Sequence, residues 1–70
     1  MFNLYESIAL YQTERGRNWM QAFFKDYSVP LMAERFGPET LLQAFERNTT
    51  GKARTRATKF IRQALRNYAF

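Results

Sequence analysis

The chain contains neither cysteine nor histidine, and both absences exclude kinds of site. Without them there can be no disulfide, and the usual ligand sets for zinc are missing. The same two residue types supply the common nucleophile and general base of enzymes, and the six carboxylates are scattered along the sequence. We therefore expect a protein without catalytic activity, without a metal and without a cofactor.

Long apolar runs are also missing. No stretch approaches the roughly 18 to 20 apolar residues that a membrane span requires. Residues 1–14 have no basic start, no uninterrupted apolar segment and no small-residue cleavage site, so we expect no secretory leader. These features predict a cytoplasmic protein that neither spans nor binds a membrane.

Acidic residues are absent from the last third of the sequence. Residues 48–70 contain six cations and no acid, whereas residues 1–47 contain five cations and six acids. The first segment therefore carries a charge of about −1 and the second about +6. The net charge of +5 arises almost entirely in the C-terminal segment.

Glycine and proline are few, and they fall between segments of helical periodicity. Apolar residues recur three and four positions apart, and no alternating run is long enough to predict a strand. Apolar residues make up 46% of the chain and aromatic residues 17%, which favours a packed core over disorder. The predicted fold class is all-α: one domain over residues 1–70, a compact bundle of four to five short helices with a longer basic amphipathic C-terminal helix. The expected helices cover residues 4–14, 18 to before Pro30, 30–36, 39–48 and from about 51 onward.

Several residues at the expected boundaries are suited to starting or stopping helices. Asn3 and Asn18 each precede a residue three positions on that completes a capping-box spacing. Gly16 supplies the left-handed stop that favours the end of a helix. Thr49 or Thr50 is suited to cap the last helix.

The last helix has two chemically different sides. At about 100° per residue, its apolar side chains and its cations separate onto opposite faces, with Arg54 at the boundary. The apolar face, which we expect to pack in the core, consists of Ala53, Ala57, Phe60, Ile61, Ala64, Leu65 and Tyr68. The basic face consists of Lys52, Arg56, Lys59, Arg62 and Arg66.

A row of cations without acids is typical of surfaces that bind polyanions. A helix face that serves only solubility usually mixes charge signs and gains favourable pairs. Four of the six cations are arginines, which suit bidentate contact with phosphate. We therefore predict that Lys52, Arg54, Arg56, Lys59, Arg62 and Arg66 bind nucleic acid, either DNA or RNA. The alternative partner is an acidic protein surface, contacted through the same arginines.

A helix-turn-helix motif is a further hypothesis for DNA binding. Ala33 and Gly37 have the spacing of the two most characteristic positions of that motif. Gln43 and Glu46, however, fall where the second half needs buried aliphatic side chains. A plain turn between two helices explains this segment better, so the C-terminal helix remains the expected contact with DNA.

The N-terminal helix is apolar on more sides than one core contact requires. We therefore predict that the protein self-associates, as a homodimer, through Phe2, Tyr5 and Leu10. A second aromatic cluster, at residues 19–27, could in principle stack nucleic-acid bases. Its members share one helical face, so packing in the core is the preferred interpretation.

Overall fold

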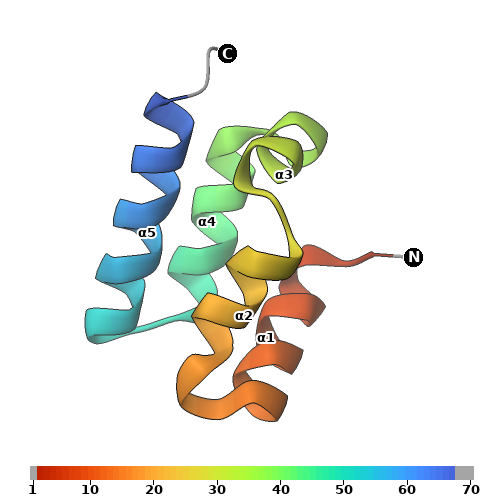
Figure 1. The fold of residues 1–70 in the computed structure, drawn as a ribbon, viewed down its shortest axis with the longest axis vertical. Coiled ribbons are helices and arrows are strands. Elements are labelled where there is room, and N and C mark those ends of the chain that lie inside the picture. The colour runs from red at the N-terminus through yellow and green to blue at the C-terminus, as the bar shows by residue number, and fades with distance from the viewer. Residues whose placement is uncertain (1, 68–70) are drawn as a thin grey trace.

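A computed structural model describes residues 2–67, and helices account for most of them (Figure 1). The α-helices are α1 (Leu4–Arg15), α2 (Trp19–Asp26), α3 (Val29–Phe36), α4 (Pro38–Asn48) and α5 (Gly51–Arg66). A short 3-10 helix, η1 (Gly16–Asn18), joins α1 to α2. The described residues form no strand, and α5 is the longest of their helices. The predicted all-α bundle with a longer C-terminal helix is confirmed.

Local hydrogen bonds explain several helix boundaries. The side-chain oxygen of Asn3 accepts the backbone N–H of Glu6 at 3.0 Å and caps α1, as its position predicts. Gly16 ends α1 with a φ of +59°, a conformation that favours glycine over other residues. The Ser28 hydroxyl accepts the N–H of Leu31 at 3.5 Å and caps α3.

Two of the predicted caps do not form. Asn18 lies in η1 with φ −99° and ψ 15°, whereas a capping residue needs extended backbone, and its side chain makes no capping bond. Thr50 is extended, but its side chain makes no capping bond either. The hydroxyl of the buried Thr49 instead donates to the carbonyl of Phe45. Thr49 therefore closes the last turn of α4 and does not cap α5.

The core is built around α4, which lies between α1 and α5 (Figure 1). Phe45 and Leu41 of α4 are fully buried in a cluster with Ile8 of α1, Phe23 of α2 and Ile61 of α5. The rings of Phe23 and Phe45 meet edge to face, with centroids 5.4 Å apart. Each such side chain favours folding by about 1.5 to 3 kcal/mol when it leaves water. The same cluster includes Met32 of α3, so all five α-helices are joined through it.

The side of α5 that faces the core is largely the predicted one, but it extends to Thr58 and leaves out Phe60. Ala57, Thr58 and Ile61 are buried, while Ala64 and Leu65 are half-buried. The hydroxyl of Thr58 donates to a carbonyl of the preceding turn at 2.9 Å, which lowers the cost of burying a polar group. The core-facing side is therefore turned toward Thr58.

Phe60 is the residue most affected by this rotation, and its predicted place in the core is wrong. Its side chain is 46% exposed. The ring packs against Phe24 of α2, with centroids 4.6 Å apart, and lies otherwise at the surface. The predicted apolar face did not include Thr58, whose burial turns the core-facing side of α5 away from Phe60. Tyr68, predicted on the same face, lies outside the described residues.

Candidate nucleic-acid interface

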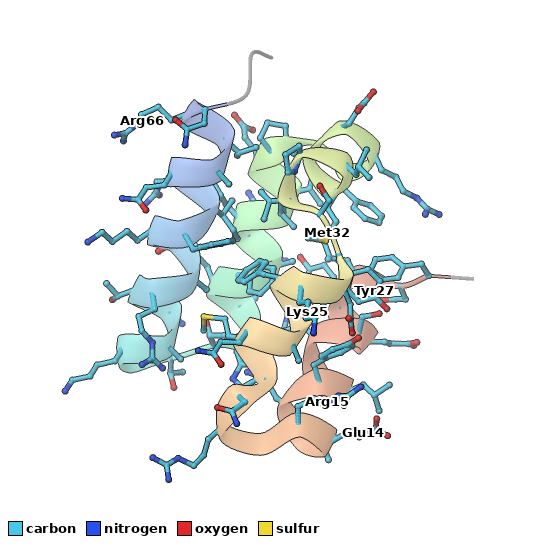
Figure 2. All side chains as sticks on the ribbon, viewed as in Figure 1. Glu14, Arg15, Lys25, Tyr27, Met32 and Arg66 are labelled. Atoms are coloured by element: carbon cyan, nitrogen blue, oxygen red, sulfur yellow. The ribbon has the colours of Figure 1, made fainter. Side chains whose placement is uncertain are left out.

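Five of the six predicted cations form a row along the outer side of α5. They are Lys52, Arg56, Lys59, Arg62 and Arg66, and all are exposed. Because they are three or four positions apart, they follow one side of the helix, and the row is about 21 Å long. Figure 2 shows Arg66 at the end of α5 with its side chain directed away from the other helices. We call this row the basic face.

The basic face has no acidic residue within its own helix to neutralise it. Residues 48–70 contain no aspartate or glutamate, so each cation has only cations as charged neighbours along α5. Like charges at this spacing repel one another and weaken a helix slightly. The uncompensated charge gives the outer side of α5 a positive potential, which attracts anionic ligands.

Arg54 has a different position from the other five cations. Its Nε donates to the carbonyl of Thr49 at 3.0 Å, just beyond the end of α4. A cation near the C-terminus of a helix also interacts favourably with the helix dipole. Arg54 therefore joins α5 to α4, and the structure separates it from the basic face.

An open groove of about 940 Å³ lies beside the basic face, between α5 and the segment formed by η1 and α2. Arg17, Lys25 and Arg56 line it, and its described lining contains no carboxylate. The other lining residues are Gly16, Asn18, Trp19, Met20, Gln21, Phe24 and Phe60. Lys25 is labelled on α2 in Figure 2. The groove thus adds two cations from a distant part of the sequence to the side of the molecule that carries Arg56.

Arg17 and Lys25 are not among the cations that the sequence predicts to bind a ligand. Counted over residues 1–47, the cations are outnumbered by acids, which hides any local excess. A shorter window would have found the signal, because residues 15–25 contain three cations and no acid. Their position beside Arg56, in contrast, depends on where the fold places α2 relative to α5.

Aromatic rings form one wall of the groove and continue into the core. Trp19 and Phe45 are nearly parallel, with centroids 6.2 Å apart and an interplanar angle of 12°. Phe45 and Phe24 follow at 5.2 Å and 25°, and Phe24 and Phe60 at 4.6 Å and 32°. All three spacings lie within the range of favourable aromatic contacts. We call these four rings the aromatic stack, and Phe60 is its exposed end.

The three residues predicted to support self-association do not form one patch. Phe2 packs within its own chain, with its ring centroid 4.8 Å from that of Tyr27 and 5.7 Å from that of Phe36. Tyr5 and Leu10 are 38% and 53% exposed, but they are about 140° apart around α1. Self-association stays a prediction, with Leu10 as its most accessible residue.

Helix α4 is poorly placed to read DNA as the second helix of a helix-turn-helix. α3 and α4 are joined at Gly37, where the motif would turn. However, α4 is the central helix of the bundle, and its residues Leu41, Ala44 and Phe45 are buried. Its exposed residues include Glu39 and Glu46, which would repel phosphates. The geometry favours α5 as the element that meets a polyanion.

Within residues 2–67, no three acidic side chains gather in a way that could hold a metal ion. None of the helices in that range is both long and apolar enough to cross a bilayer. No protein family, curated protein or solved structure matches this chain.

Proposed function

We propose that the protein binds nucleic acid, DNA or RNA, through the basic face of α5, in a non-catalytic regulatory or architectural role. The supporting observation is the row of five exposed cations, about 21 Å long, on a helix without acids. Such cations neutralise phosphates and release the counterions condensed on the nucleic acid, which favours association. Three of the five are arginines, whose planar head can contact two phosphate oxygens at once.

The groove supports the same proposal because it extends the positive surface beyond α5. Arg17 and Lys25 reach it from η1 and α2, while Arg56 belongs to both the groove and the basic face. Cations on two separate elements suit a ligand whose negative charge is spread over a length. The phosphate backbone of a nucleic acid has that distribution of charge.

An acidic protein surface remains the alternative partner for the same cations. Tight protein interfaces usually have an apolar or aromatic centre surrounded by a polar rim. The residues exposed among the cations of the basic face include Thr55 and Gln63, which are polar. The exposed ring of Phe60 lies beside this row, in the groove, so the row itself resembles a phosphate-contacting surface more than a protein interface. We also propose that the protein is cytoplasmic, in a compartment that contains RNA in every cell.

The direct test is the binding of the purified protein to labelled duplex DNA and structured RNA across a salt series, by fluorescence anisotropy. If the five cations of the basic face each contact a phosphate, log affinity for the duplex should fall with log salt at a slope of about −4 to −5. An acidic protein serves as the control and should bind more weakly than either nucleic acid. Absence of nucleic-acid binding at low salt, or stronger binding of the acidic protein, would contradict the proposal.

A further inference from the structure

The exposed end of the aromatic stack lies in a hollow whose lining includes three cations and no carboxylate. Phe60 shares the groove with Arg17, Lys25 and Arg56. Its ring contacts Phe24 at a centroid distance of 4.6 Å, yet the side chain stays 46% exposed. The inner rings are held by the core, since Phe45 is fully buried and Trp19 nearly so. Phe60 is therefore a supported aromatic surface with cations around it.

These neighbours define the chemistry of a ligand. An exposed aromatic ring offers stacking to another flat ring, and the three cations offer contacts to anions. The side chains of Asn18 and Gln21 add hydrogen-bond donors and acceptors to the lining. A ligand that makes all three kinds of contact, stacking, ionic and hydrogen-bonded, must carry a flat ring, a nearby anion and polar groups at the edge of the ring. A nucleotide with an unpaired base has these properties.

The base must be unpaired, because a base inside a duplex is already stacked on its neighbours and is out of reach of a protein side chain. The groove volume of about 940 Å³ is near the upper end of the roughly 300–1,000 Å³ found for ligand sites. It is open at the surface and adjoins the basic face through Arg56, so a strand can enter and leave along α5.

We propose that the groove between α2 and α5 binds single-stranded nucleic acid, with an unpaired base stacked on Phe60 and phosphates bound by Arg17, Lys25 and Arg56. This inference rests on the proposed function and adds to it the strandedness of the ligand. Stacking of this kind tolerates every base, so recognition is weakly dependent on sequence. A duplex gains phosphate contacts alone, whereas a single strand also gains the stacking contact.

The test compares wild-type protein with Phe60→Leu on labelled single-stranded DNA, single-stranded RNA and duplex DNA. Leucine keeps an apolar contact with Phe24 but removes the flat ring. We expect single-strand affinity to fall roughly tenfold, because one base–aromatic stack contributes about that factor. Affinity for the duplex should stay unchanged within error, and Phe60→Tyr should retain single-strand affinity. Comparing the affinities for single-stranded DNA and single-stranded RNA shows which of the two supplies the unpaired base.

A second measurement uses the wild-type protein alone and so does not depend on how the variant folds. A strand of abasic nucleotides keeps the phosphates and lacks the bases, and it should bind roughly tenfold more weakly than an ordinary strand of the same length. Trp19, the one tryptophan of the chain, lines the groove and reports occupancy by its fluorescence. Its emission should change with the ordinary strand and not with the duplex.

The possible failures are distinguishable. If duplex and single strand bind equally, and neither Phe60→Leu nor loss of the bases matters, the stacking site is wrong while the phosphate-binding proposal stands. If single strands bind more weakly than the duplex, the stacking site is equally wrong. If neither form binds at low salt, both proposals fail together.

Discussion

At the scale of single residues, Tyr11 and Asp26 make a polar link between α1 and α2. The Tyr11 hydroxyl donates to a carboxylate oxygen of Asp26. This hydrogen bond, together with partial burial, raises the pKa of Tyr11 from about 10 to about 12. The Tyr11 ring also meets Phe23 edge to face at 5.2 Å, so the same side chain contributes to packing.

The raised pKa predicts how stability depends on alkaline pH. Since the folded pKa lies above the unfolded one, the contribution of Tyr11 is fully present below about pH 10 and is lost as the pH rises toward 12. A spectrophotometric titration of the tyrosines should therefore show a step near pH 12 as Tyr11 ionises. Asp26→Asn should bring that step closer to the ordinary value, and Tyr11→Phe should remove it. An identical titration curve for Asp26→Asn would contradict the link.

Two phenylalanines with different exposure give a second prediction at this scale. Phe45 is fully buried, so Phe45→Ala should lower the free energy of unfolding by about 3 to 5 kcal/mol. Phe60 is 46% exposed, so Phe60→Ala should cost only about 1 to 2 kcal/mol. Urea unfolding followed by circular dichroism measures both. An equal loss for the two variants would show that Phe60 lies in the core after all.

At the scale of helices, the junction of α4 and α5 depends on Arg54. Its hydrogen bond to the Thr49 carbonyl lies where α4 ends, and Thr49 itself donates to Phe45 within the last turn of α4. The two contacts explain how a segment of two residues can reverse the chain between two packed helices. The junction also holds the first turn of α5 close to the core.

Arg54→Ala should therefore lower the free energy of unfolding, with a smaller effect on the binding of nucleic acid. Loss of the hydrogen bond should cost about 1 kcal/mol, which lowers the melting temperature of a domain of this size by about 4 to 8 °C. Lys52→Ala removes the same charge from the exposed first turn of α5 and is the matched control. Thermal unfolding of the two variants compares them directly. A larger loss of stability in the Lys52 variant would contradict the role of Arg54.

The order and type of the helices could be predicted because their signals are local. Gly16, Gly37 and the caps at Asn3 and Ser28 act within a few residues of the boundaries they set. The orientation of α5 could not be predicted in full, because burial of Thr58 depends on a hydrogen bond within the folded helix and on the space beside α4. The spacing of apolar residues in the sequence indicates neither the hydrogen bond of Thr58 nor the space beside α4.

At the scale of the whole molecule, charge is distributed unevenly. Arg66 of α5 lies on the opposite side of the view from Glu14 at the end of α1 (Figure 2). Residues 1–47 carry about −1 and residues 48–70 about +6, so α5 is the origin of most of the field. Such asymmetry can orient the protein as it approaches an anionic ligand and speed association at low salt.

The candidate site could be predicted only in part at this scale. The basic face follows from sequence because its members lie on one helix, and the structure exposes all five of them. The groove could not be derived in the same way, since Arg17 and Arg56 are far apart in the sequence and line one groove only in the folded chain. Phe60 was assigned to the core for the related reason that its surroundings belong to another helix.

The most direct test of the central claim compares two double variants with the same net charge. Arg62→Gln with Arg66→Gln removes two cations from the basic face, while Arg15→Gln with Arg35→Gln removes two exposed cations from α1 and α3. The first pair should make the salt slope of duplex binding shallower by about two units and weaken binding at low salt. The second pair should leave the slope as it is in the wild type. Equal slopes for the two double variants, measured with both proteins folded, would show that net charge and not the basic face governs binding.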